Sequence, residues 1–282
     1  MSFATRFAPS PSGLLHLGHA FSALTAFEAA RSADGRFVLR IEDIDTTRCR
    51  PDFEAAILED LAWLGLDWEK PVRRQAEHFA EYAARLDDLR KRGLVYRCFK
   101  TRREILEEIA RAPHGPAEVY LGPAERMDRD EEEERVERGE AYAWRLSLAT
   151  AREHLGARWE HLAFQEEGEM HRGEHRARPE TAGDVVLARK DVATSYHLAV
   201  VHDDALQGMS HIVRGEDLFE ATHIQVLLQE LFELPRPVYR HHRLILDEAT
   251  GKRFAKRDKA ATLRAMREAG ESPASIRARL GF

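Results

Sequence analysis

The chain has 282 residues, of which 43% are hydrophobic and 33% are charged, and its formal net charge is -6 at pH 7. This composition is that of an ordinary globular protein, long enough for one large domain with an insertion or for two domains. Because the only cysteines are Cys49 and Cys98, a disulfide framework is not expected and a zinc site of four cysteines is excluded.

The N-terminus, MSFATRFAPS, has no basic segment followed by an apolar one. The sequence also contains no run of about 18 apolar residues, the length needed to cross a membrane. We therefore expect neither export nor membrane insertion, and the cytoplasm is the default location.

Residues 6–19, RFAPSPSGLLHLGH, predict a loop that joins a first strand to a helix. Two prolines stiffen the loop, and two glycines let a ligand approach the backbone. His16 and His19 would lie on one face at the start of the helix, where backbone N–H groups attract anions. A phosphate site is one interpretation and a surface turn is the other. Zinc would need a further ligand, which the segment does not offer.

Apolar spacing predicts α/β alternation as far as residue 98. We expect helices over residues 20–31, 53–64 and 79–89, and a short strand, FVLRI, over 37–41. Gly65 and Gly93 are placed to end the second and third helices.

Residues 99–183 lack the regular α/β alternation of the preceding segment and predict an α+β insertion. They contain one short helix, RREILEEIAR, a stretch rich in proline and glycine, and two strand candidates, AYAWRLSL and WEHLAF. The run 128–140 holds eight acids and three arginines, which predicts a solvated helix face.

Alternation returns with DVVLAR (184–189), YHLAVVHDD (196–204), a helix HIQVLLQELF capped by Thr222, and a strand RLIL (243–246). The predicted fold class is α/β, a Rossmann-type parallel sheet made from residues 1–98 and 184–259. The insertion 99–183 splits this sheet, and short helices follow over 260–282. Residues 236–259 hold eight Lys/Arg against three acids, which favours contact with nucleic acid despite the net charge.

Three blocks in this order resemble the class I aminoacyl-tRNA synthetases of the glutamyl branch. PSPSGLLHLGH resembles their HIGH signature, RIEDID (40–45) with Arg48 resembles the next block, and GKRFAKRD (251–258) resembles the KMSKS-type loop. YHLAVVHDD and IVRGEDL lie between them, so the resemblance spans most of the chain. It implies the class I Rossmann-type fold.

The resemblance also implies a reaction, in which ATP with Mg²⁺ activates L-glutamate as glutamyl-adenylate. His16, His19 and Lys256 would be catalytic, and ATP would be bound by His16, Gly18, His19, Lys256 and Arg257. Glutamate would be bound by Arg6, Phe7, Ala8, Pro9, Ser10, Glu42, Tyr196 and Arg214. A guanidinium binds a carboxylate bidentately, so Arg6 and Arg214 are the candidate cations, and Glu42 would pair with the ammonium.

Length favours a shortened member of the branch. Full glutamyl-tRNA synthetases continue with a helical anticodon-binding region of domain size, whereas this sequence ends about 25 residues after its KMSKS-like loop. The resemblance to shortened members implies that the acceptor is the queuosine base in the anticodon of tRNA(Asp). We expect a monomer.

Three departures from the family pattern stand out. Proteins of this type often hold zinc with a C-x-C pair and a later Tyr and Cys, and the matching places here are Cys98, Lys100, Tyr120 and Ala124. Two of the four ligands are missing, so no structural zinc is expected. In the KMSKS-like loop, Arg253 and Ala255 replace the usual first lysine and the serine. Val200 stands where asparagine commonly follows the pocket tyrosine, which favours an altered glutamate pocket.

Three alternatives stay open. A shortened synthetase that charges tRNA(Glu) would need the missing anticodon-reading region. An inactive RNA-binding paralogue is favoured by the degenerate KMSKS-like loop, but His16, His19, Glu42 and Lys256 are intact. A small-molecule nucleotidyltransferase could share the H-x-x-H phosphate site, although the insertion and the two candidate arginines count against it.

Overall fold

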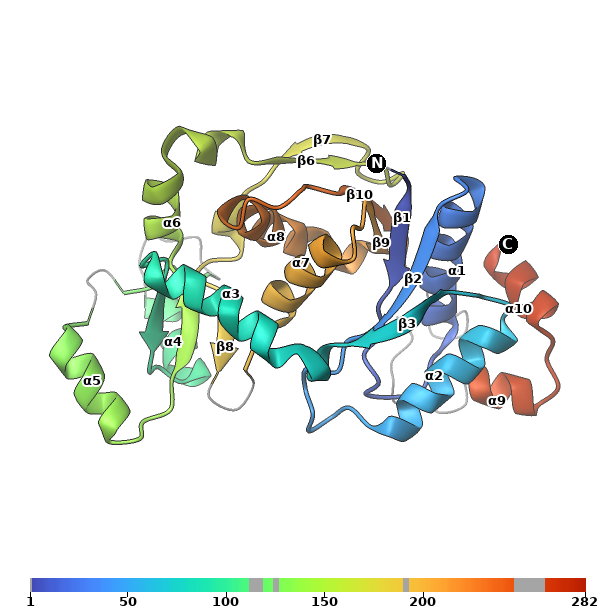
Figure 1. Cartoon of the computed structure of the whole chain (residues 1–282), viewed down its shortest axis with the longest axis horizontal. Helices are drawn as coiled ribbons and strands as arrows, with labels where there is room; N and C mark the ends of the chain where they lie inside the picture. The colour runs from blue at the N-terminus through green and yellow to red at the C-terminus, as the bar shows by residue number, and fades with distance from the viewer. Residues whose placement is uncertain (1, 112–118, 124–126, 190–192, 246–261) are drawn as a thin grey trace.

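The central sheet is built from both ends of the chain (Figure 1). The computed structural model describes residues 2–111, 119–123, 127–189, 193–245 and 262–282. Parallel strands β1 (Ala4–Phe7), β2 (Arg36–Ile41) and β3 (Glu69–Arg74) form one part, and parallel β9 (His211–Gly215) and β10 (Val238–His242) form the other. β1 lies beside β9, where the Ser210 N–H donates to the Ala4 carbonyl at 3.0 Å. The predicted α/β architecture with a parallel sheet is confirmed.

Five helices pack around this sheet: α1 (Leu17–Ser32), α2 (Pro51–Trp63), α3 (Phe79–Lys91), α7 (Tyr196–Leu206) and α8 (Phe219–Leu231). The first three match the predicted helices. Gly65 and Gly93 follow α2 and α3 with φ values of +79° and +68°, which favour glycine at a helix end. Short 3₁₀ turns lie at Gln75–His78, Gly156–His161, Pro179–Thr181 and Glu216–Leu218.

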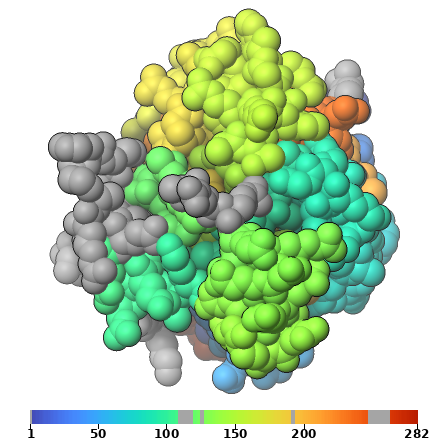
Figure 2. All heavy atoms as spheres, turned by 90° about the vertical axis from the view of Figure 1, so that its left-hand side faces the viewer, coloured from blue at the N-terminus to red at the C-terminus, as the bar shows by residue number. Residues whose placement is uncertain are grey.

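The inserted segment forms its own antiparallel sheet in the order β4-β5-β8. Its strands are β4 (Val95–Cys98), β5 (Ala143–Leu146) and β8 (Val186–Arg189), and helices α4 (Arg102–Arg111), α5 (Arg129–Glu137) and α6 (Leu148–Leu155) accompany them. Figure 2 shows α5 and α6 at the surface of this end of the molecule. Because β4 and β8 pair with β5, this sheet takes its edge strands from outside the predicted bounds 99–183.

A hairpin of β6 (Ala163–Glu166) and β7 (Gly173–Arg176) leaves the insertion and joins the main sheet. β6 runs parallel to β10, with Tyr239 opposite Glu166. The inserted segment therefore reaches β10, the neighbour of β9.

Three local predictions were wrong. Residues 243–245 are not a strand; β10 is Val238–His242, because that segment pairs in register with β9. In WEHLAF only Ala163 and Phe164 belong to a strand, since a 3₁₀ turn ends at His161. Thr222 does not cap a helix: it lies inside α8 and is fully buried. Its hydroxyl oxygen accepts a hydrogen bond from the Arg214 guanidinium.

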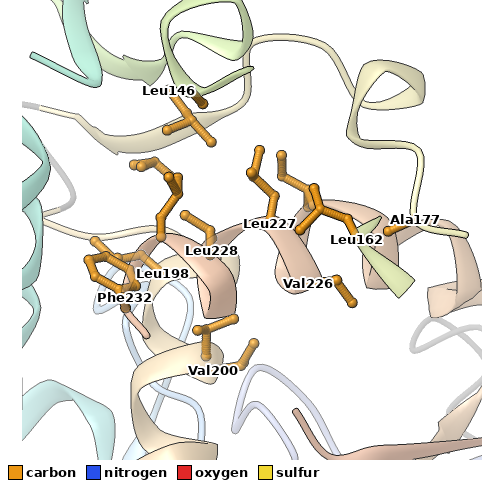
Figure 3. Close-up of a cluster of buried hydrophobic side chains, with 14 of the residues drawn as sticks. Leu146, Leu162, Ala177, Leu198, Val200, Val226, Leu227, Leu228 and Phe232 are labelled. Atoms are coloured by element: carbon orange, nitrogen blue, oxygen red, sulfur yellow. The ribbon is translucent and has the colours of Figure 1, made fainter. Parts of the chain in front are cut away.

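The larger hydrophobic core fixes α7 and α8 against β5 and the insertion (Figure 3). Leu198 and Val200 of α7 and Leu227 and Leu228 of α8 all belong to this core, and all four are at most 1% exposed. Burying a side chain of this size stabilises the folded state by about 1.5–3 kcal/mol. Val200, which departs from the family pattern, thus lies in the core.

The C-terminal helices α9 (Leu263–Glu268) and α10 (Pro273–Leu280) pack against α1 and α2 in a second core cluster. Arg267 of α9 donates to Glu59 at 2.6 Å and to Asp60 at 3.4 Å. Arg277 of α10 pairs with Glu28. None of the helices in the described part of the chain has both the length and the apolar character of a membrane crossing.

Replacing Asp60 by asparagine should stabilise the protein at neutral pH. Burial raises the pKa of Asp60 from 3.8 to about 6, against the opposing charges of Arg267 and Arg264. Folding therefore loses stability as pH rises from 3.8 to 6, by up to about 3 kcal/mol, and the loss is constant above that range. In urea titrations at pH 7, the free energy of unfolding of the Asp60→Asn variant should be higher than that of the wild type by up to about 3 kcal/mol.

The pH dependence distinguishes ionisation from packing. The advantage of Asp60→Asn should shrink steadily between about pH 6 and pH 4, because the wild-type carboxyl becomes protonated in the folded state while it is still mostly ionised in the unfolded state. An advantage that does not change with pH would contradict the explanation. Glu59→Gln is the control, because its exposed carboxylate has a lowered pKa and its loss should only weaken the contact with Arg267.

Candidate active site

Four predicted glutamate-binding residues meet at the carboxyl ends of neighbouring strands. Arg6 lies on β1, Glu42 directly follows β2, and Arg214 lies on β9. Tyr196 begins α7, where Ser195 caps the helix by accepting from the Leu198 N–H. Arg214 Nη1 donates to the Tyr196 hydroxyl at 3.4 Å. Burial raises the pKa of Tyr196, and the charges of Arg214, Glu42 and Arg6 also act on it, so the four groups share one electrostatic environment.

A chain of alternating charges connects Arg6 to Glu42. Arg6 donates through Nε to Asp204 Oδ1 at 3.0 Å and through Nη2 to Oδ2 at 3.4 Å. Arg40 Nη1 donates to the same Oδ1 at 2.7 Å, and Arg40 Nη2 donates to Glu42 Oε1 at 3.0 Å. Arg40 is fully buried and Arg6 is 4% exposed, so these pairs are only weakly screened by water.

The pKa shifts follow from this arrangement. Burial opposes ionisation of Asp204, but Arg6 and Arg40 prevail and lower its pKa. Burial raises the pKa of Glu42, with Arg40 and Arg6 opposing the rise. A ligand ammonium beside Glu42 would favour its ionised form in the same way as these arginines do.

Arg214 differs from Arg6 in its partners. Its guanidinium donates to the neutral acceptors His241 Nε2, Tyr196 Oη, Gln225 Oε1, Leu218 O and Thr222 Oγ1, at 2.8–3.4 Å. No described carboxylate forms an ion pair with it, whereas Asp204 neutralises Arg6. A buried cation held by neutral groups is suited to take the carboxylate of a ligand.

The loop after β1 contributes less through its side chains than predicted. Phe7 is buried in the second hydrophobic cluster, so its side chain belongs to the core. The Pro9 carbonyl accepts from the Glu42 N–H at 3.0 Å and joins the loop to the end of β2. Ala8 is half-buried, and Ser10 is exposed with its Oγ 3.6 Å from Cys49 Sγ.

His16 and His19 cap the N-terminus of α1. His16 Nδ1 accepts from the Gly18 N–H at 3.1 Å, and His19 Nδ1 accepts from the His16 N–H at 3.2 Å. Each neutral ring therefore carries its proton on Nε2, which makes Nε2–H a donor for anions. A Cβ on Gly18 would stand 3.1 Å from the His16 ring, so glycine is favoured there.

The two histidines line a pocket of about 280 Å³. Its walls are His16, Gly18, His19, Ser22, Gly215, Asp217, His242, Arg243, Leu244 and Ile245. Lys256 and Arg257, predicted to act here, lie outside the described residues, as do Arg253 and Ala255. The described chain stops at Ile245 in this pocket and resumes at Thr262, which forms a β-bridge with His16. Ile245 and Thr262, the described residues that flank residues 246–261, therefore both lie at the histidines.

The pocket combines donors suited to phosphate oxygens: imidazole N–H groups, a helix N-terminus and Arg243. Asp217 is the only carboxylate among its described walls, and no described cluster of three His, Cys, Asp or Glu could hold a metal ion.

The family's zinc position does not fit the residues of this chain. Cys98 and Tyr120 share a small buried cluster, and the Lys100 ammonium lies 5.6 Å from the centre of the Tyr120 ring. An ammonium is no metal ligand and repels a cation. Ala124 lies outside the described residues. A cavity of about 900 Å³ adjoins this cluster, but it is lined mostly by β4 and the insertion, with Arg90 of α3, and its lining includes none of the arginines and histidines described above.

Metal analysis of the purified protein should find substoichiometric zinc. The double variant Lys100→Cys/Ala124→Cys restores the family's four ligands and should gain one zinc per chain, because thiolates bind this ion tightly. One zinc per chain in the wild type would contradict the prediction, and so would a double variant that binds none while remaining folded.

Sequence reasoning missed the residues that hold the site together: Arg40, Asp204, Glu166, Thr222, Gln225 and His241. One signal was available. YHLAVVHDD ends an apolar helix with two adjacent aspartates, and charges on such a face need buried partners.

Comparisons with known proteins establish the family of the chain. The family model described as tRNA synthetases class I (E and Q), catalytic domain, matches residues 2–281. The chain belongs to this family, and the class I Rossmann-type fold is confirmed.

Among individual relatives, a glutamyl-Q tRNA(Asp) synthetase of Rhodobacter capsulatus is 51% identical over 99% of this chain and 99% of its own length. A glutamate–tRNA ligase of Aquifex aeolicus is 36% identical over 96% of this chain but only 55% of that protein. The crystal structure of a glutamate tRNA ligase from Elizabethkingia meningosepticum, in complex with its amino acid, superposes with a TM-score of 0.72 at 28% identity, over 92% of this chain and 52% of that one. The chain thus spans about half the length of these two ligases.

Proposed function

We propose that the chain activates L-glutamate with ATP and transfers it to the queuosine base in the anticodon of tRNA(Asp), as a monomer in the cytoplasm. The observation that carries the proposal is the placement of two buried arginines and Glu42 at one sheet edge, beside a histidine pair suited to phosphates. The relative that matches both full lengths is a glutamyl-Q tRNA(Asp) synthetase.

In the first step, the α-carboxylate of glutamate attacks the α-phosphate of ATP. A carboxylate–phosphate anhydride forms and pyrophosphate leaves. Arg214 and Arg6 hold carboxylate charge, and Glu42 receives the ammonium. His16 and His19 donate from Nε2 to phosphate oxygens, while Lys256 and Arg257 neutralise the β- and γ-phosphates together with Mg²⁺. Such a reaction needs positioning and charge stabilisation more than a covalent intermediate.

In the second step, a hydroxyl of the queuosine base attacks the glutamyl carbonyl. The new ester bond forms as the anhydride bond breaks, and AMP leaves.

Two measurements test the proposal. Glutamate-dependent exchange of pyrophosphate into ATP should occur without RNA. Labelled glutamate should then appear on tRNA(Asp) that contains queuosine, but not on tRNA(Asp) without queuosine or on tRNA(Glu). Charging of tRNA(Glu) would support the alternative suggested by the Aquifex relative, a glutamate–tRNA ligase. Absence of any exchange would instead favour an inactive RNA-binding protein.

A further inference from the structure

Behind Arg214 lies a buried pair, Glu166 and His241, that the proposed chemistry does not use. Both side chains are 0% exposed. Glu166 ends β6 of the inserted hairpin, and His241 lies on β10, which pairs with β6. Polar atoms this deep in a protein need hydrogen-bond partners, so the contacts decide what the pair can do.

Three donors fix the Glu166 carboxylate. Its Oε1 accepts from the Gly168 N–H at 2.6 Å and from the His241 N–H at 2.9 Å, and its Oε2 lies 2.5 Å from His241 Nδ1. A Cβ on Gly168 would stand 2.2 Å from the His241 carbonyl oxygen, so only glycine brings this N–H so close. Burial opposes ionisation, but the bonds from His241 and Gly168 prevail and lower the pKa of Glu166.

The carboxylate determines which ring nitrogen of His241 carries the proton. An ionised carboxylate only accepts, so Nδ1 must be the protonated nitrogen. The lone pair of Nε2 is then available, and Arg214 Nε donates to it at 3.0 Å. Burial lowers the pKa of His241, which keeps the ring neutral beside the guanidinium.

We propose that Glu166 and His241 are positioning residues for Arg214. Glu166 fixes the tautomer of His241, and His241 Nε2 fixes the angle at which the guanidinium meets a carboxylate. This inference rests on the proposed function, in which Arg214 binds glutamate. The inserted segment thereby supports the amino-acid pocket through β6.

Two replacements of His241 separate orientation from packing. In His241→Gln, the amide oxygen lies near the former Nε2 and accepts from Arg214, while the bond to Glu166 is lost. In His241→Asn, the amide nitrogen lies near the former Nδ1 and donates to Glu166, while Arg214 loses its acceptor. In pyrophosphate exchange, the KM for glutamate should rise about tenfold to a hundredfold in His241→Asn and about threefold or less in His241→Gln.

The KM for ATP should not change in either variant, because residue 241 does not line the pocket of His16 and His19. Equal KM values for glutamate in the two variants would overturn the proposal. His223→Asn is the matched control, since His223 is also a buried histidine and its Nδ1 accepts from the Arg178 N–H at 3.3 Å. It should lower stability and leave the KM for glutamate unchanged. A rise as large as in His241→Asn would also count against the proposal.

Glu166→Gln gives a readout independent of activity. The glutamine oxygen must accept from the two backbone N–H groups, so its amide donates to His241 Nδ1 and the ring proton moves to Nε2, facing Arg214. Long-range ¹H–¹⁵N spectra of histidine-labelled protein should show the His241 ring protonated at Nδ1 in the wild type and at Nε2 in Glu166→Gln. A wild-type ring protonated at Nε2 would overturn the inference. If the wild type shows the expected tautomer but no glutamate-dependent exchange, the proposed function fails instead.

Discussion

Asp204→Asn is expected to lose both stability and affinity for glutamate. The substitution removes the anion that Arg6 and Arg40 share, and it leaves two buried guanidinium groups facing an amide. Breaking a buried ion pair by removing one partner costs about 3–5 kcal/mol in free energy of unfolding. Because the same chain of contacts sets the spacing between Arg6 and Glu42, the KM for glutamate should rise about tenfold or more.

The neighbouring aspartate provides a matched control. Asp203 is also buried, and its carboxylate lies 3.7 Å from Arg40 Nε, but its hydrogen-bond donors are Arg73 at 2.8 Å, Gln75 at 2.9 Å and Tyr82 at 2.9 Å, on the side of β3 and α3 and outside the chain of hydrogen bonds from Arg6 to Glu42. Asp203→Asn should therefore destabilise the protein to a similar degree and leave the KM for glutamate near that of the wild type. Urea titration and pyrophosphate exchange on both variants give the comparison. If both raise the KM equally, the contacts of Asp204 do not set the pocket.

The pH dependence of stability offers a second check on Asp204. Its pKa is lower in the folded than in the unfolded protein, so its contribution is present above pH 3.8 and is lost as pH falls through the folded-state pKa. The difference in free energy of unfolding between the wild type and Asp204→Asn should accordingly become smaller as the pH falls below 3.8.

Lys256→Ala is expected to lower the rate of adenylation about a hundredfold to a thousandfold, the usual effect of removing one preorganised charge-stabilising group. The physical reason is the position of the segment ends. Leu244 and Ile245 line the pocket of His16 and His19, and the Leu263 N–H donates to the Leu15 carbonyl at 2.8 Å where the described chain resumes. The described residues on either side of 246–261 thus lie beside the histidine pair.

Glutamate binding should be nearly unaffected by Lys256→Ala, because the candidate cations for the carboxylates of glutamate are Arg6 and Arg214, at the ends of β1 and β9. Pyrophosphate exchange gives the rate, and isothermal titration with glutamate gives the affinity. Lys259→Ala, which removes the same charge from the same segment, should leave the rate close to that of the wild type. Equal loss of rate and of glutamate affinity in Lys256→Ala would contradict the assigned role.

Local sequence patterns were enough to predict much of the catalytic half of the fold. The spacing of apolar residues predicted α1, α2 and α3, and glycine with positive φ ended α2 and α3 as expected. Errors arose where pairing with a distant strand decides which segment becomes a strand. VYRHH rather than RLIL became a strand, because β10 takes its register from β9.

In the candidate site, too, the local features were predictable from the sequence and the long-range contacts were not. The sequence by itself determined the histidine pair at the start of α1, because a capped helix terminus is a local structure whose contacts lie within four residues. Motifs also placed Arg6, Glu42 and Arg214 in one site.

Only the tertiary structure decided what holds those residues. Arg6 meets Asp204 across 198 positions of sequence, and His241 meets Glu166 across 75. Such contacts depend on which strands become neighbours and in which register, and hydrophobic periodicity carries neither piece of information. Burial then makes each contact strong, because a charge removed from water must find its partner within the fold.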